Sequence, residues 1–173
     1  MFTLLKLLQS LVKTLHSDGT PGQVAAGIML GAAVGLTPLV SAHNLPIALL
    51  ICVLNVSFGG ALLGLALFAP LGFLLDPLFD RIGHRLLVET PALEPFWTWM
   101  YNTPGVALTG FNNTIVLGSL VSWIVLAVPI YLAARAGIIR YRATIGERVR
   151  QSRFYRAVTA SRAYNVYSWF RPR

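Results

Sequence analysis

The sequence predicts an all-α integral membrane protein, and its composition and hydropathy pattern support this class. Of the 173 residues, 55% are hydrophobic and only 12% are charged, which is about half the charged fraction of an average globular protein. Long uncharged runs alternate with glycine, proline and short polar clusters, a pattern typical of membrane helices. The chain is too apolar for intrinsic disorder, and its single cysteine, Cys52, excludes a disulfide scaffold.

We expect an N-terminal amphipathic interfacial helix, a short helical hairpin, two longer transmembrane helices and a basic cytoplasmic tail helix. The corresponding segments are residues 1–17, 20–87 (the hairpin and the helix after it), 88–113 (a Trp-rich interfacial segment), 114–134 (a transmembrane helix) and 135–173 (the tail).

The first segment is amphipathic rather than uniformly apolar. Lys6, Ser10, Lys13 and Ser17 recur at helical spacing among leucines, so they form one polar stripe. A basic helix of this kind favours the membrane interface, although the same stripe also suits a helix that packs on the rest of the protein. The cluster at residues 17–22 then breaks the helix.

Residues 24–40 and 45–75 are uncharged and are subdivided by breakers. Seventeen residues reach only about 25 Å, less than the bilayer core of about 30 Å. We therefore expect two short helices, near 24–40 and 45–54, followed by a longer one near 60–79. The short pair forms either a re-entrant hairpin or two tilted crossings.

The segment after these helices is rich in aromatic residues, which favour the headgroup level. Its aromatic members are Phe96, Trp97, Trp99, Tyr101 and Phe111. Residues 114–134 then form the clearest span, with 21 uncharged residues and one proline, Pro129.

The basic charge of the protein lies in its tail. Residues 135–173 hold ten arginines and one glutamate, a net charge of +9, whereas the whole chain carries +8. Arginines beside a span stay in the cytoplasm and attract anionic lipid headgroups, so the C-terminus is expected inside. Lys6 and Lys13 indicate the same side for the N-terminus. Protein docking is a weaker alternative, and nucleic acid is not an expected partner. The expected headgroup ligands are Arg135, Arg140, Arg142, Arg148, Arg150, Arg153 and Arg156.

Glycines at four-residue spacing predict close helix packing. Gly27, Gly31 and Gly35 form one ridge, and Gly60 and Gly64 form another. The ridges favour packing inside one protomer, while self-association is the alternative.

Two polar clusters are candidate sites. The hairpin candidates are Thr37, Pro38, His43, Asn44, Asn55 and Ser57; they either line a polar site at membrane depth or cap a turn at the bilayer surface. The helix-end cluster is Asp76, Asp80, Arg81, His84 and Arg85. Its carboxylates could bind a cation or relay a proton, but salt-bridging is the commoner role. No sequence motif for a metal, a cofactor or a catalytic nucleophile is present, so we expect neither a cofactor nor an enzyme.

The stretch from Gly22 to Pro38 resembles the opening motif of the bacterial domain-of-unknown-function family 2062. The resemblance continues through His43-Asn44-Leu45-Pro46 and covers about residues 20–87. It departs from the family where Asn55-Val56 replaces a frequent Asn-Pro pair. The resemblance implies an inner-membrane location and a helical hairpin but no reaction. It also implies an association with large envelope proteins of the bridge-like lipid-transfer type.

These features lead to one expected function and one alternative. We expect a non-enzymatic inner-membrane subunit that anchors or works with a larger envelope protein in phospholipid transport between membranes. Its expected partners are the anionic leaflet and either that envelope protein or a second copy of the chain. The alternative is a small channel or transporter that uses a polar re-entrant hairpin.

Overall fold

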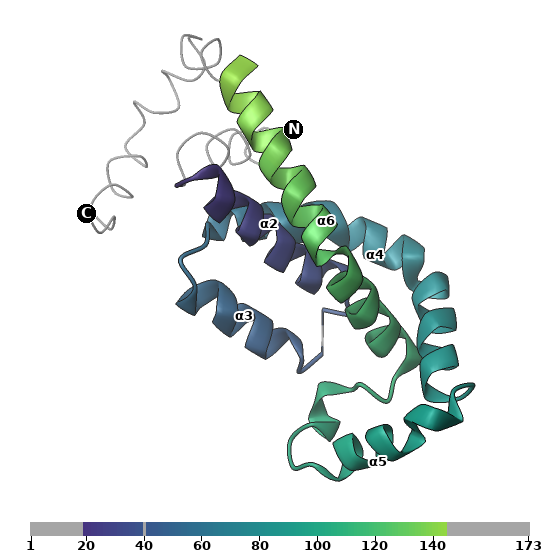
Figure 1. Ribbon diagram of the computed structural model, residues 1–173. Coiled ribbons are helices and arrows are strands. Elements are labelled where there is room, and N and C mark those ends of the chain that lie inside the picture. Colours follow the sequence, from purple (N-terminus) through teal and green to yellow (C-terminus); the bar gives the residue numbers. More distant parts are fainter. Residues whose placement is uncertain (1–18, 40, 145–173) are drawn as a thin grey trace, which may run out of the picture.

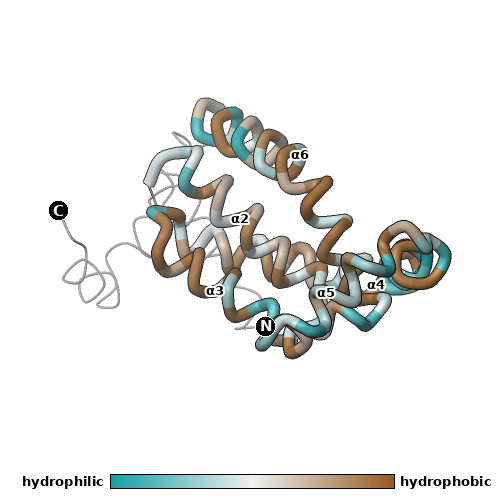
Figure 2. Tube along the Cα trace, turned by 60° about the horizontal axis from the view of Figure 1, so that its bottom comes forward, coloured by the Kyte–Doolittle hydropathy of each residue, from teal (hydrophilic) through white to brown (hydrophobic). Residues whose placement is uncertain are grey.

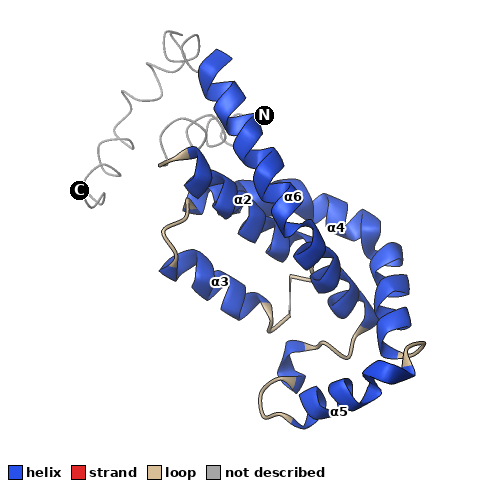
Figure 3. Ribbon diagram, viewed as in Figure 1, coloured by secondary structure: helices blue, strands red, loops and turns tan. Residues whose placement is uncertain are grey.

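The computed structural model describes residues 19–39 and 41–144, and within these ranges every regular element is a helix (Figure 3). The elements are α2 (Pro21–Leu36), α3 (Asn44–Val53), α4 (Phe58–Leu87), η1 (Pro91–Leu93), α5 (Glu94–Asn102), η2 (Ala107–Thr109) and α6 (Thr114–Thr144). The expected amphipathic helix at residues 1–17 and most of the basic tail lie outside the described residues.

Helix α2 has strong signals at both ends. Thr20 accepts a hydrogen bond from the backbone N–H of Gln23 (3.3 Å), and the Gln23 side chain accepts one from the Thr20 backbone (2.8 Å). This capping box, with Pro21 in the first turn, fixes the start of the helix. The helix ends at Leu36 rather than near residue 40, because Pro38 disfavours helical backbone at the residue before it.

Helices α2 and α4 run in the same direction, in close contact along glycines. Gly60 lies against Val24, Gly64 against Ile28 and Gly72 against Leu36. The residue numbers at the contacts therefore increase in the same direction along both helices. At this separation side chains no longer fit between the backbones.

Helix α6 runs antiparallel to α4 and crosses α2 (Figure 1). Gly83 lies against Thr114 and Gly118 against Phe79, so positions on the two helices advance in opposite directions. The three helices form the core, with α2 contributing the largest number of its buried apolar residues.

Helix α3 returns along the outside of this core. Ile47 is its one buried residue, whereas Leu45, Leu49 and Val53 are exposed. Figure 2 shows that hydrophobic residues prevail along α3. This helix therefore presents an apolar surface away from the core.

Two helices extend beyond the expected boundaries. Helix α4 was expected at 60–79 but continues to Leu87, and it bends along its length (Figure 1). It contains Pro70 and Pro77, which remove backbone hydrogen bonds and kink a helix. Helix α6 was expected to end at residue 134 but continues to Thr144, because arginine and alanine are good helix formers.

Helices α4 and α6 are long and apolar enough to cross a membrane. Only 22% of the most apolar window of each is buried inside the protein. The core helix of a soluble protein would bury most of such a window. The two helices thus indicate membrane association, with most of their apolar surface facing outward.

Candidate functional site

The turn between α2 and α3, hereafter the hairpin tip (residues 37–44, of which 40 is not described), is closed by side-chain hydrogen bonds. The Thr37 hydroxyl lies 2.9 Å from the Ala33 carbonyl oxygen and 3.1 Å from Oδ1 of Asn44. Nδ2 of Asn44 donates to the carbonyl oxygens of Pro38 (3.0 Å) and Leu39 (3.1 Å). The amide of Asn44 thus replaces the backbone partners that the turn lacks.

The hairpin tip is bound to a segment far along the chain. The Ser41 hydroxyl donates to the carbonyl oxygen of Thr109, 3.2 Å away, and Nδ1 of His43 lies 2.8 Å from the same hydroxyl. A hydroxyl has one proton, so if Ser41 donates to Thr109, Nδ1 of His43 carries the ring proton and donates to Ser41. In that arrangement the neutral ring of His43 carries its proton on Nδ1 and leaves Nε2 unprotonated.

His43 is 5% exposed. Its second ring nitrogen, Nε2, is buried and has no hydrogen-bond partner among the described residues. Burial lowers the pKa of His43, and interaction with the Thr109 backbone opposes this effect. Protonation would place an unpaired charged N–H in this environment, so the neutral ring is favoured.

The remaining hairpin candidates do not join this cluster. Asn55 is exposed and Ser57 is buried, and both lie at the opposite end of α3. The Ser57 hydroxyl accepts from the N–H of Gly60 (2.9 Å), and its backbone N–H donates to the Gln23 carbonyl (3.1 Å). Ser57 therefore caps α4 and fixes its start beside α2.

The helix-end cluster lies in the second half of α4, and its closest side-chain contacts involve a residue not included in the expected cluster. Glu89 is 3.8 Å from His84 and 3.9 Å from Arg85, while Asp80 accepts a hydrogen bond from the Thr114 hydroxyl. A cleft of about 390 Å³ is lined by Asp80, Arg81, His84, Arg85 and Glu89. Asp76 does not line it, and no group of three or more potential metal ligands occurs in the described ranges.

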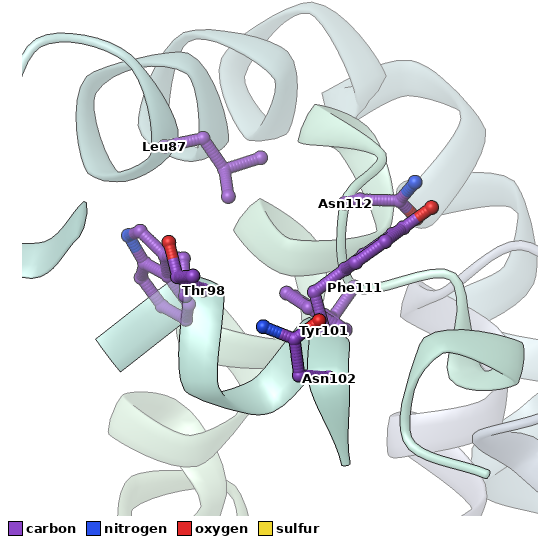
Figure 4. A pocket seen from close by; sticks show the side chains of 7 residues that line it. Leu87, Thr98, Tyr101, Asn102, Phe111 and Asn112 are labelled. Carbon is purple, nitrogen blue, oxygen red and sulfur yellow. The ribbon is translucent and has the colours of Figure 1, made fainter. Parts of the chain in front are cut away.

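Residues 88–113, hereafter the aromatic lobe, pack beneath the end of α4 and form a pocket of about 320 Å³. The indole N–H of Trp97 donates to the Leu86 carbonyl (2.8 Å), and its ring stacks on Phe111 with centroids 6.2 Å apart. Figure 4 shows Leu87 and Phe111 on different sides of this pocket. Its lining residues are Leu87, Trp97, Thr98, Tyr101, Asn102, Phe111 and Asn112.

All five expected packing glycines lie where α2 meets α4 in the same chain. A Cβ atom built on Gly31 would overlap the Ala61 carbonyl group, and one built on Gly27 would overlap the carbonyl oxygen of Ser57. The glycines therefore set the distance between two helices of one protomer.

The expected headgroup ligands are only partly described. Arg135, Arg140 and Arg142 lie on the final part of α6, and Nη1 of Arg142 donates to the Gly19 carbonyl (3.0 Å). The other four, Arg148, Arg150, Arg153 and Arg156, lie outside the described residues.

Comparison with known proteins identifies the family. Residues 6–145 match a family described as an uncharacterized protein conserved in bacteria, DUF2062. The chain belongs to this family. It is also 30% identical, over 139 residues, to an uncharacterized protein of Treponema pallidum (strain Nichols), covering 80% of this chain and 85% of the relative. No solved structure matches it.

The family assignment confirms the resemblance seen in the sequence and extends it. The resemblance covered residues 20–87, whereas the DUF2062 match includes the aromatic lobe and α6. The narrower range reflects the glycine motif, which is confined to the first helices, while the later helices carry only general hydrophobic patterns.

Sequence reasoning missed several residues that shape this DUF2062 protein. Gly72, Gly83 and Gly118 make helix contacts as close as those of the expected ridges; isolated glycines in apolar helices were the available signal. The pairing of Ser41 with Thr109 had no local signal, because 68 residues separate the partners.

Proposed function

We propose that this DUF2062 protein is a non-catalytic inner-membrane subunit that anchors a larger envelope protein through its aromatic lobe, in a system that moves phospholipid between membranes. The observation that carries the proposal is the difference between the two ends of the molecule. A closely packed apolar core separates the aromatic lobe, with Arg81 and Arg85 beside it, from Arg135, Arg140 and Arg142 at the other end.

The lengths of the uncharged segments support membrane insertion. Residues 115–134 of α6 contain no charge and correspond to about 30 Å of helix, the thickness of the hydrocarbon core. The charged part of α4 begins at Asp76, at the opposite end of the core from Arg135. Two arginines, Arg81 and Arg85, lie at the lobe end of α4, whereas ten follow the span of α6. Because the end richer in arginine favours the cytoplasm, the aromatic lobe is assigned to the outer face.

In this arrangement α2 and α3 form a re-entrant hairpin that enters from the cytoplasmic side. Leu36, at the end of α2, lies against Gly72, one helical turn before Asp76. The hairpin tip thus comes close to the outer surface before the chain returns. Its Asn44 and Ser41 bonds satisfy irregular backbone at that depth, as such a position requires.

The packing of the core favours an anchor over the alternative channel. The buried hydroxyls of Thr37 and Ser119 donate to carbonyl oxygens of their own helices, Ala33 (2.9 Å) and Val116 (3.1 Å). Backbone contacts at the glycines fill the space between α2, α4 and α6. These groups would have to release their bonds before they could conduct a polar solute.

The lobe has exposed aromatic side chains suited to docking a partner. Phe96 and Trp99, which lie outside the pocket lining, are 47% and 64% exposed, and aromatic residues are enriched in binding hot spots. The test is a photo-crosslinking amino acid introduced at Trp99 in living cells, with Phe73 on α4, which is 83% exposed, as the control position.

We expect a discrete crosslink from Trp99 to one envelope protein, identified by mass spectrometry, and lipid adducts only from Phe73. Deletion of the gene should raise envelope permeability to the same extent as deletion of that partner. A Trp99 position that crosslinks only to lipid, or only to a second copy of the chain, would refute the proposed anchoring role.

A further inference from the structure

The pocket in the aromatic lobe has the chemistry of an acyl-chain site. Its volume of about 320 Å³ lies at the small end of the range for small-molecule sites, about 300–1,000 Å³. None of its seven lining residues is charged, and Leu87, Trp97 and Phe111 supply apolar surface. A charged ligand would lose its hydration without gaining a partner here.

The polar groups of the pocket are amides and hydroxyls. Asn102 and Asn112 are exposed, as are Thr98 and Tyr101, whereas Phe111 is 4% exposed. The pocket therefore has a buried aromatic wall and an uncharged polar rim (Figure 4). This arrangement suits a hydrocarbon chain with ester oxygens near the rim, since amides and hydroxyls donate hydrogen bonds to such oxygens.

The walls of the pocket are held by contacts on both sides. The Trp97 indole is bonded to Leu86 at the end of α4, and Phe111 lies two residues from Thr109, which accepts the bond from Ser41. The hairpin tip and α4 thus hold the two aromatic rings in place. A pocket that does not need to reorganise loses less free energy on binding.

A second cleft is lined by residues that lie close in sequence to Leu87 of the pocket, at the end of α4 and just after it. Glu89, two residues after Leu87, lines this cleft with Arg85 and His84. It carries both signs of charge, whereas the pocket carries none. A zwitterionic headgroup complements a cleft of this kind, and its acyl chain complements the pocket.

We propose that the aromatic lobe binds a zwitterionic phospholipid, with the ester end of one acyl chain in the pocket and the headgroup at the neighbouring charged cleft. The inference rests on the membrane insertion of the proposed function and names the lipid that such a subunit would hold. It assigns the pocket to lipid and the exposed face of α5 to the partner protein.

The test uses the purified full chain in nanodiscs that contain a phosphatidylethanolamine with a photoactivatable diazirine near the ester end of one acyl chain. We expect adducts at Trp97, Tyr101 or Phe111, mapped by mass spectrometry. Asn112→Trp fills the mouth of the pocket. If the new indole excludes two methylenes of the acyl chain from the pocket, binding weakens by about tenfold. Adducts on pocket residues should therefore fall by about that factor.

Ala92→Trp is the matched control, since it adds the same indole at an exposed position outside the pocket. It should leave labelling unchanged, and both variants should keep the wild-type melting temperature; a second plug, Thr98→Trp, serves if Asn112→Trp unfolds. The same diazirine on a phosphatidylglycerol should give fewer pocket adducts.

Three results would overturn the inference. They are adducts confined to the outer faces of α4 and α6, pocket labelling that neither plug lowers, and equal labelling by the two headgroups. Because the purified sample contains no partner protein, these results are independent of the crosslinking at Trp99. A failed partner crosslink therefore refutes the anchoring role without refuting the lipid site.

Discussion

Replacing Gly118 with alanine is expected to destabilise the protein, while the same change at Gly137 on the same helix is not. A Cβ atom at position 118 would overlap the Phe79 carbonyl group, which belongs to the backbone of α4 and cannot rotate away. At Gly137 nothing lies within 4 Å of the added atom. The pair therefore separates helix packing from helix propensity.

The expected magnitudes follow from these surroundings. Overpacking costs about 1–3 kcal/mol, and a rigid backbone neighbour places Gly118→Ala near the upper end. Alanine in an open helical position gains about 0.5–1 kcal/mol over glycine. After this gain is included, Gly118→Ala should lose about 2 kcal/mol and Gly137→Ala should gain up to about 1 kcal/mol.

Thermal unfolding in detergent micelles, followed by circular dichroism, measures both variants. In a domain of this size 1 kcal/mol shifts the melting temperature by about 2–4 °C, so Gly118→Ala should melt about 4–8 °C lower. Gly137→Ala should melt at the wild-type temperature or slightly above it. Equal shifts for the two variants would refute the close approach of α4 and α6.

Two further predictions concern the hairpin. Burial lowers the pKa of His43 in the folded state, whereas in the unfolded state the pKa is about 6.5. Below that pH the unfolded state binds more protons than the folded state, so the free energy of unfolding falls as pH decreases. The rate of amide hydrogen exchange near residues 41–45 should therefore rise below that pH. His43→Gln should abolish this pH dependence, and His84→Gln should leave it unchanged. Exchange that does not depend on pH in the wild type would contradict the prediction. Ser57→Ala removes the cap of α4 and should cost about 1 kcal/mol, whereas Ser57→Gly should cost only a few tenths; equal melting temperatures of the two variants would count against the cap.

Much of the helical order could be predicted from the sequence, because uncharged runs and breakers are local signals. The turn at Pro38 and the start of α6 at Thr114 follow from them. The ends of α4 and α6 could not be placed, because Arg81, Arg85 and Arg135 are exposed and propagate a helix as well as apolar residues do.

The candidate site was predictable only in part. His43 and Asn44 were recognised as polar groups in an apolar context, and the structure bonds Asn44 to Thr37 and His43 to Ser41. Asn55 does not join these residues, because helix α3 separates it from the hairpin tip. The pocket depends on Trp97 meeting Phe111, and no spacing rule encodes that contact between a helix and a later loop.

The most direct test of the account is the membrane orientation of its two ends. In a Cys52→Ser background, single cysteines at Ala92 in the aromatic lobe and Ala143 at the end of α6, both exposed, are treated with a membrane-impermeant maleimide in intact cells. We predict labelling of Ala92→Cys in intact cells and of Ala143→Cys only after the inner membrane is opened. Equal labelling of both positions before lysis, or the reverse pattern, would contradict the proposed arrangement.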